Sequence, residues 1–258
     1  TQRQYDSADG ERHYRVWTAV PDKAPPAAGY PVLYMLDGNA VMDKLDDAFL
    51  QQLFAGSPPV IVAIGYQTAL PFDTAARAWD YTPPLKTHEP RAGKPALPPR
   101  KTGGNDVFRQ LLTETMVPQT EANLKIDPHQ RAIWGHSYGG LFVLDAWRKA
   151  SPFGIYYSAS PSLGQALQSP LQASQSLDAV RFRGKSLYLL EGDGKARGEP
   201  SGHEASLEVL RQTQQQLASK GLTVAFWRYP GLTHGQMFEV SLRSALLHLS
   251  GQAALAHQ

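Results

Sequence analysis

The residues best able to do chemistry are the six from Gly135 to Gly140, which read Gly-His-Ser-Tyr-Gly-Gly. They match the pattern G-x-S-x-G, and they lie between an apolar run ending at Trp134 and a helical run starting at Leu141. A sharp turn from a strand into a helix leaves no room for large side chains beside the serine, and it lifts the serine Oγ above the edge of the sheet. The helix N-terminus behind the serine favours developing negative charge. The pattern therefore predicts that Ser137 is a nucleophile.

A serine hydroxyl needs a base within hydrogen-bond reach before it can attack a carbonyl carbon. The sharp turn that carries such a serine is called a nucleophile elbow, and in chains that contain one the histidine base comes last in chain order. This chain has eight histidines. Only His234 lies in a loop between an apolar run, Ala225–Tyr229, and a final helical pattern. His136 adjoins the serine and is expected to face away from its Oγ. We therefore predict His234 as the base.

The acid that would orient the histidine is left open by the sequence. It should follow the strand before the histidine's own strand, and Asp193 is the nearest exposed candidate there. Glu191 could still belong to the strand, and Glu204 opens the following helix. The position three residues after Gly192, where an acid is frequent, holds Lys195. We take Asp193 as the first choice and keep Glu191, Glu204 and a Ser–His dyad without an acid as alternatives.

Acyl transfer also requires donors for the oxyanion that forms in the transition state. One is expected to be the backbone N–H of Tyr138, the residue after the nucleophile. The other should come from the turn Leu36–Asn39, which follows a predicted strand. Asn39 N–H is our choice and Gly38 N–H the alternative.

Short apolar runs rich in Val, Ile and Tyr alternate with amphipathic stretches along the chain. This alternation predicts an α/β fold with a mostly parallel central sheet and helices on both faces, in a single domain spanning residues 1–258. The expected strands are His13–Val20, Pro31–Leu36, Val60–Tyr66, Arg131–Gly135, Gly154–Ser158, Lys185–Leu190 and Thr223–Tyr229. The expected helices are Val41–Leu53, Asp106–Leu124 with Asn105 as N-cap, Gly139–Lys149, Glu204–Ser219 and Gln236–Leu249.

Composition excludes several classes of function. The 258 residues include no cysteine, which excludes disulfides, thiolate metal sites and a cysteine nucleophile. A net charge of +2 is too small to indicate nucleic-acid binding, and the apolar runs are shorter than the roughly 20 residues that span a bilayer. The first residues, Thr1–Gln4, do not begin a signal sequence, so we expect a mature chain from which such a segment is absent or removed.

One segment, at about residues 83–104, interrupts the alternation. Between Pro83 and Thr102 there are six prolines and five Lys or Arg residues, with Glu89 the only acid. Proline removes a backbone donor and fixes φ, so this segment is expected to be a loop. A loop of this length is either a solvated surface segment or a basic flap over an anionic ligand.

With these features in place the chain resembles the putative-esterase, esterase D-like branch of the α/β-hydrolases. The matching stretches are Tyr34–Asn39, Arg77–Pro83, Gly135–Gly140, and Val224–Pro230 with Gly231–Phe238. The last of these is closer still to the periplasmic trilactone siderophore esterases, which act on enterobactin and salmochelin. This resemblance implies the α/β-hydrolase fold, serine-dependent hydrolysis of a triserine trilactone without metal or organic cofactor, and a periplasmic location. A Ser–His dyad, described for some members, fits the lysine at position 195.

The resemblance also implies an anionic, aromatic substrate, a catecholate siderophore taken free or as its ferric complex. Arginine can bind such a ligand through its positive charge, through the paired N–H donors of its planar guanidinium group, and by stacking on an aromatic ring. We therefore expect Arg77 to contact a catecholate. Trp79, which follows it closely in the same loop after the strand Val60–Tyr66, is the second expected substrate-binding residue. The alternative is that Arg77 only pairs with Asp73 or Asp80.

Two rival functions are kept. One is a general carboxylesterase or thioesterase of the S-formylglutathione or feruloyl esterase type. The other is a non-catalytic siderophore-binding protein on the same scaffold. Docking to an outer-membrane siderophore transporter is a further expectation that rests on the resemblance alone.

Overall fold

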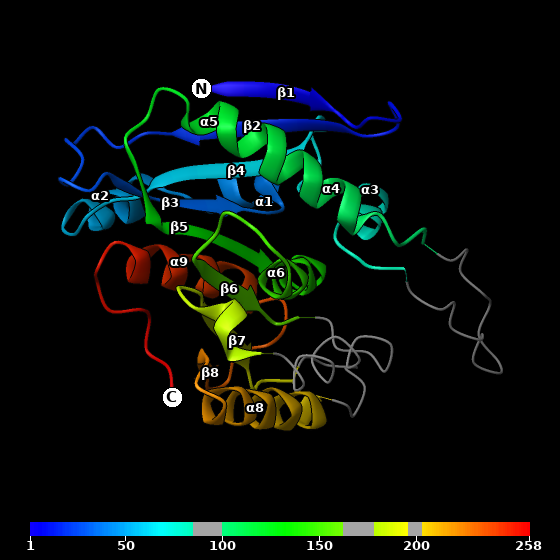
Figure 1. Cartoon of the computed structure of the whole chain (residues 1–258), viewed down its shortest axis with the longest axis vertical. Helices are drawn as coiled ribbons and strands as arrows, with labels where there is room; N and C mark the ends of the chain where they lie inside the picture. The colour runs from blue at the N-terminus through cyan, green and yellow to red at the C-terminus, as the bar shows by residue number, and fades with distance from the viewer. Residues whose placement is uncertain (85–99, 162–177, 196–202) are drawn as a thin grey trace.

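A computed structural model of the chain describes residues 1–84, 100–161, 178–195 and 203–258, the last range without the side chains of residues 203–206. Eight strands join one sheet in the order β1-β2-β4-β3-β5-β6-β7-β8 (Figure 1). The strands are β1 Gln2–Asp6, β2 His13–Ala19, β3 Tyr30–Met35, β4 Val60–Tyr66, β5 Ile126–His136, β6 Ile155–Ala159, β7 Ser186–Gly192 and β8 Thr223–Tyr229. The helices are α1 Gly38–Met42, α2 Asp47–Phe54, α3 Thr74–Asp80, α4 Asn105–Leu111, α5 Val117–Glu121, α6 Tyr138–Arg148, α8 His203–Ser219 and α9 Met237–Leu249.

The sheet is parallel from β4 to β8 and antiparallel only where β1 and β2 join it. Strands β3 and β5 are neighbours, with Met35 opposite Trp134, and β7 pairs with β8. Because the carboxyl ends of parallel strands meet at one edge, the segments that follow β3, β5 and β8 emerge there together. These are the segments that carry Asn39, Ser137 and His234.

Helices cover both faces of the sheet, as the sequence predicts. Along β3 the side chains alternate between two cores: Tyr34 lies in the core under α4 and α6, and Met35 in the core under α1, α2 and α9. All residues of β3 and β4 are buried, which is why these strands read as continuous apolar runs rather than alternating ones.

The seven predicted strands are all present; most differ by one or two residues at their ends, but β5 begins at Ile126 rather than at Arg131. Strand β1 was missed because it is an edge strand whose residues are mostly exposed, so it carries no apolar alternation. Helix α3 was predicted as a loop. Its N-cap is Asp73, whose side chain accepts a hydrogen bond from the Ala76 N–H.

Two predicted helices are interrupted. The predicted helix 41–53 is two helices, because Asp46 caps a new start at α2 by accepting from the Phe49 N–H. The predicted helix 106–124 contains a π-helical turn, Leu112–Met116, directly before the segment that holds Pro118. Proline has no N–H to donate and its ring crowds the carbonyl four residues earlier, which accounts for the wider turn.

The expected N-cap of α4 was wrong. Gly104 is the N-cap, and Asn105 is the first helical residue, whose Nδ2 donates to Asp145 Oδ2 at 2.9 Å.

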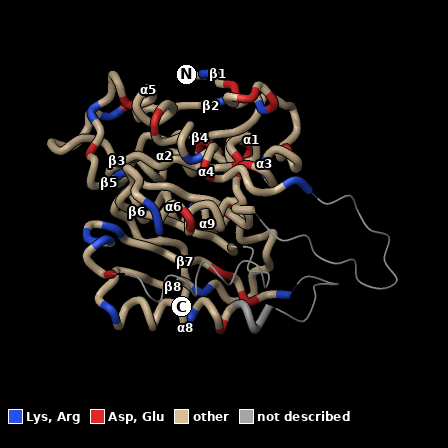
Figure 2. The backbone as a smooth tube through the Cα atoms, turned by 45° about the vertical axis from the view of Figure 1, so that its right-hand side comes forward, with Lys and Arg blue, Asp and Glu red and all other residues tan. Residues whose placement is uncertain are grey.

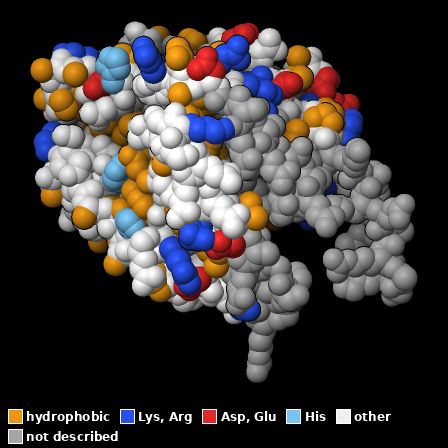
Figure 3. All heavy atoms as spheres, turned by 60° about the horizontal axis from the view of Figure 1, so that its bottom comes forward, with side chains coloured by type: hydrophobic (Ala, Val, Ile, Leu, Met, Phe, Trp, Pro, Cys, Tyr) orange, Lys and Arg blue, Asp and Glu red, His pale blue; other side chains and the backbone are white. Residues whose placement is uncertain are grey.

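Of the proline-rich basic loop, residues 85–99 lie outside the described residues. Basic and acidic residues are interspersed along the described chain, and the face turned forward in Figure 3 mixes charged and apolar side chains (Figures 2 and 3). Among the described helices none is both long and apolar enough to cross a bilayer.

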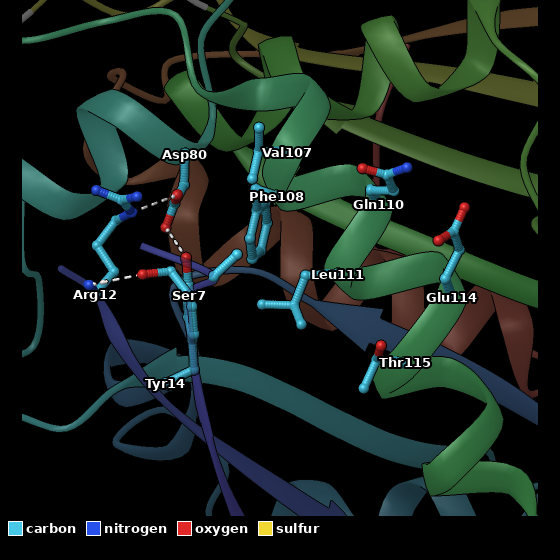
Figure 4. Close-up of a pocket in the computed structure, with 11 residues that line it drawn as sticks. Ser7, Arg12, Tyr14, Asp80, Val107, Phe108, Gln110, Leu111, Glu114 and Thr115 are labelled. Atoms are coloured by element: carbon cyan, nitrogen blue, oxygen red, sulfur yellow. Dashed lines mark hydrogen bonds and ion pairs between the residues drawn. The ribbon is translucent and has the colours of Figure 1, made fainter. Parts of the chain in front are cut away.

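The carboxylate of Asp80 fastens the end of α3 to the sheet (Figure 4). Its Oδ2 accepts hydrogen bonds from the hydroxyls of Tyr14 at 2.8 Å and Tyr66 at 2.7 Å. Its Oδ1 lies 3.3 Å from Arg12 Nε. Burial raises the pKa of Asp80 to about 6, although the two hydroxyls and Arg12 oppose the rise. The folded chain therefore binds a proton at Asp80 more tightly than the unfolded chain does.

This shift predicts a pH dependence of stability. Folding takes up a proton at Asp80 between pH of about 4 and about 6, so the stability that this group supplies is lost as the pH rises through that window. In Asp80→Asn the loss should vanish, and the free energy of unfolding should fall with pH less steeply than in the wild type, by roughly 2–3 kcal/mol across the window. Urea unfolding at pH 4, 5, 6 and 7 measures it, with the exposed Asp43→Asn as control. Parallel curves for wild type and Asp80→Asn would contradict the assignment.

Candidate active site

Ser137 sits in the sharp turn between β5 and α6, with φ 61° and ψ −117°. A positive φ is costly for a residue with a side chain, so the surroundings must hold it. They do so through close backbone approach: a Cβ at Gly135 would lie 2.3 Å from the Gly139 carbonyl oxygen, and one at Gly140 would lie 2.7 Å from that of Ala159. The Ser137 N–H also donates to the Ala159 carbonyl at 2.9 Å. Space therefore requires glycine at positions 135 and 140, whereas a Cβ at Gly139 would make only ordinary contacts, the nearest at 3.6 Å.

His234 lies in the loop between β8 and α9, and its Nε2 is 3.1 Å from Ser137 Oγ. With a neutral imidazole the hydroxyl donates to this nitrogen, which is the arrangement needed to remove the serine proton. The loop is closed by Thr233 and Gln236. The Thr233 N–H donates to Gln236 Oε1 at 2.9 Å, and the Gln236 N–H donates to Thr233 Oγ1 at 3.3 Å. The structure therefore brings together the predicted nucleophile and the predicted base.

The candidate acids are engaged in other contacts. Asp193 Oδ2 accepts from Arg228 Nε at 2.9 Å, and Asp193 Oδ1 accepts from the Gly231 N–H at 2.6 Å. These bonds direct the carboxylate toward the start of the histidine loop. Glu191 is part of β7, and its Oε1 accepts from Ser160 Oγ at 2.8 Å. The side chain of Glu204 lies outside the described residues. The role of triad acid for Asp193 stays a prediction.

The two predicted oxyanion donors lie in the first turns of α1 and α6, the helices that follow the paired strands β3 and β5. Tyr138 is the first residue of α6 and Asn39 the second of α1, positions whose N–H groups have no acceptor within their own helix. The Asn39 side chain ties the end of β4: Nδ2 donates to the carbonyls of Tyr66 and Thr68, both at 3.0 Å, and Oδ1 accepts from the Tyr66 N–H at 2.8 Å. The side chain thereby fixes the turn, while the oxyanion role of the backbone N–H groups stays a prediction.

Arg77 forms a bidentate ion pair with Asp37, the residue before α1. Its Nε donates to Asp37 Oδ1 at 2.8 Å and its Nη2 to Oδ2 at 2.9 Å. The Asp37 side chain is buried, at 1% exposure, and that of Arg77 is mostly covered, at 11%. Burial alone would lower the pKa of Arg77, but the adjacent carboxylate outweighs it and raises the pKa above its usual value. Asp37 itself has φ 53°, so this ion pair stabilises a second strained turn beside the serine.

The alternative, that Arg77 pairs with Asp73 or Asp80, is therefore wrong, while its contact with a catecholate stays a prediction. Asp73 uses its carboxylate to cap α3, and Asp80 accepts the two tyrosine hydroxyls. Arg77 is also not in a loop but on α3, next to the elbow: its guanidinium carbon lies 5.5 Å from the centre of the Tyr138 ring.

Trp79 is two residues further along α3, so its side chain leaves the helix on another side. It packs on Gly104, where a Cβ would lie 2.2 Å from Trp79 Nε1. The Nζ of Lys101 lies 4.7 Å and the guanidinium carbon of Arg12 5.6 Å from the centre of its ring. The structure thus places Trp79 in a cation–aromatic group, and its substrate-binding role stays a prediction.

His136 is a site residue whose part the sequence did not reveal. Its Nε2 donates to the carbonyl oxygen of His234 at 2.8 Å, and the two imidazole rings are 4.8 Å apart at 43°. The signal that could have shown it is strand alternation, because His136 shares the face of Trp134, and α9 covers that face. Among the described residues no group of three His, Asp or Glu side chains could hold a metal ion.

Comparison with known proteins agrees with this geometry. A family model described as "Putative esterase" matches residues 7–249. An apo-salmochelin esterase of Escherichia coli O6:H1 (strain CFT073) is 49% identical over 97% of this chain and 79% of its own length. The ferri-bacillibactin esterase BesA of Bacillus subtilis (strain 168) is 36% identical over 96% of this chain and 90% of its own length.

A solved structure of the enterobactin hydrolase IroE in complex with DFP superposes with a TM-score of 0.87, at 48% identity, over 98% of this chain and 95% of that one. The predicted fold and the predicted resemblance to siderophore esterases are confirmed. The chain therefore belongs to the putative esterase family of carboxylic ester hydrolases and has the α/β-hydrolase fold.

Proposed function

We propose that the chain is a serine esterase that hydrolyses the ester bonds of a catecholate trilactone siderophore of the enterobactin type. The observation that carries the esterase activity is the 3.1 Å contact between Ser137 Oγ and His234 Nε2 at a strained elbow. The substrate class is supported by the names of the relatives, an apo-salmochelin esterase and an enterobactin hydrolase.

The reaction follows from the positions of these groups. Ser137 Oγ attacks an ester carbonyl carbon while His234 Nε2 takes the hydroxyl proton. The N–H groups of Tyr138 and Asn39 stabilise the oxyanion, and collapse of the tetrahedral intermediate breaks the ester C–O bond. The leaving serine oxygen of the substrate takes the proton from His234. A water molecule, deprotonated by His234 in turn, then releases the acyl group from Ser137. No cofactor takes part in these steps, and iron would belong to the substrate.

Further parts of the proposal concern the setting of this reaction. We infer that the protein acts in the periplasm, on free or ferric siderophore, and docks to an outer-membrane transporter. The support for this is the resemblance to siderophore esterases described above. Fractionation of expressing cells by osmotic shock tests the location, and retention in the cytoplasmic fraction would contradict it.

The main prediction concerns the products. Incubation with iron-free or ferric enterobactin should convert the cyclic trilactone to linear trimer and then shorter fragments, each cut adding the mass of one water. Ser137→Ala and His234→Ala should each lower kcat by at least about 10³-fold, because the nucleophile and base act as one unit. Mass spectrometry over time measures it, with Ser219→Ala on the far end of α8 as a matched control.

Two other results of this experiment would each favour one of the two rival functions. Intact trilactone that stays bound to the wild-type chain would favour a siderophore-binding protein. A higher kcat/KM on S-formylglutathione or feruloyl esters than on enterobactin would favour a general esterase. Turnover that survives in Ser137→Ala would contradict the mechanism itself.

Arg77→Ala tests the expected contact with a catecholate. Because the Nε and Nη2 donors of the guanidinium bind Asp37, we expect turnover of anionic catechol esters and neutral acetyl esters to fall by a similar factor. The free energy of unfolding should also fall, by about 3–5 kcal/mol, because a buried carboxylate is left unpaired. Steady-state kinetics on both ester classes and urea unfolding measure these effects. A loss confined to the anionic esters would instead support a direct contact, and Arg109→Ala, which breaks an ion pair on α4, is the control.

A further inference from the structure

The buried imidazole of His136 joins the two loops that carry the catalytic pair. It ends β5, directly before Ser137, and its Nε2 binds the carbonyl oxygen of His234, 98 residues further along the chain. The side chain is buried, with 7% exposure. This single contact therefore links the position of the nucleophile's strand to the position of the base.

Aromatic packing fixes the direction of this imidazole. The ring of Phe238, in the first turn of α9, meets the His136 ring edge-on at 5.4 Å and 84°. Phe238 also packs edge-on against Trp134, at 5.3 Å, and against Phe72, at 5.7 Å. A ring held on these sides keeps its Nε2 aimed at one place, so the hydrogen bond to the loop is directional.

The carbonyl of His234 is available to His136 because of how α9 begins. In a regular helix the Phe238 N–H would donate to this carbonyl, four residues earlier. Here it donates to the Gly235 carbonyl at 3.2 Å, and the Met237 N–H donates to the Thr233 carbonyl at 3.1 Å. The acceptor at His234 is thus turned toward β5, and the imidazole of His136 satisfies it.

His136 supplies this bond without adding charge. Burial, and then the proximity of His234, lower the pKa of His136 to about 3, so its imidazole is neutral at physiological pH. A carbonyl only accepts, so His136 Nε2 carries the proton. A lysine or arginine at this place would donate as well, but its positive charge would oppose the protonation of His234 during turnover.

We propose that His136 is a positioning residue, which holds His234 Nε2 at Ser137 Oγ by donating a hydrogen bond to the backbone of the histidine loop. This inference rests on the proposed function only as far as the Ser137–His234 pair, and not on the identity of the substrate. The proposal requires that the side chain at position 136 carry an uncharged hydrogen-bond donor as far from the backbone as His136 Nε2.

The experiment compares His136→Gln with His136→Met. The side-chain nitrogen of glutamine lies at the same distance along the chain as His136 Nε2, whereas methionine has similar length and no donor. His136→Met should lower kcat on a chromogenic ester by about 10-fold to 100-fold with KM little changed, since a displacement of about 1 Å at a base has effects of this size. His136→Gln should retain turnover within about 3-fold of wild type. His129→Met, an exposed position in the same strand, is the control.

A second measurement separates this inference from the substrate assignment. The rate at which a fluorophosphonate probe labels Ser137 reports the reactivity of the Ser137–His234 pair without any siderophore. It should fall in His136→Met and recover in His136→Gln, with melting temperatures recorded for both. If the wild-type chain is labelled but cuts no catecholate ester, the proposed substrate is wrong while the role of His136 is still tested.

Two results would overturn the proposal. One is labelling of His136→Met at the wild-type rate. The other is an equal loss in His136→Met and His136→Gln while both remain folded, which would assign the effect to ring packing. Should His136→Met fail to fold, His136→Asn takes its place, because its amide is one carbon too short to reach the carbonyl. Equal labelling of the Gln and Asn variants would then overturn the proposal.

Discussion

The left-handed backbone of Ser137 is the constraint on which the site depends. A non-glycine residue at such a φ costs on the order of 1–3 kcal/mol, so this backbone conformation persists only where the contacts around it offset the strain. Here the surroundings are backbone atoms rather than side chains: the carbonyl of Gly139 against Gly135, and the carbonyl of Ala159 against Gly140 and the Ser137 N–H. Strand β6 is therefore part of the site, although it contributes no reacting group.

A second strained turn stands beside the first. Asp37 follows β3 as Ser137 follows β5, and the two strands are hydrogen-bonded neighbours. The strain at Asp37 is offset by its bidentate hydrogen bonds with Arg77. Arg77 lies on α3, and Asp80 at the end of this helix binds it to the sheet. The loop of His234 is held from the other side by His136 and by the mutual bonds of Thr233 and Gln236. Strand β5 thus serves both reactive groups, because it leads directly into Ser137 and its last residue, His136, binds the loop of His234.

Much of this could be predicted from the sequence, and the exceptions have physical causes. The apolar runs of β3 and β4, the elbow and His234 are local patterns, and they were identified correctly as elements and neighbours. The partner of Arg77 was not, because an ion pair between residues 40 positions apart depends on how α3 lies across the sheet, and no local pattern shows that. The same holds for the partner of His136: strand alternation places this side chain on the face of Trp134, but no local pattern shows that it binds a backbone carbonyl 98 residues away.

The ion pair between Arg77 and Asp37 places two opposite charges in contact beside Ser137, where they leave no net charge. Two matched charges in contact exert little force on a distant ligand. The pair therefore favours neither a charged ester over a neutral one nor the reverse. Selection between esters falls to side chains outside this pair, so the preferred ester can change while the turns at Ser137 and Asp37 stay as they are.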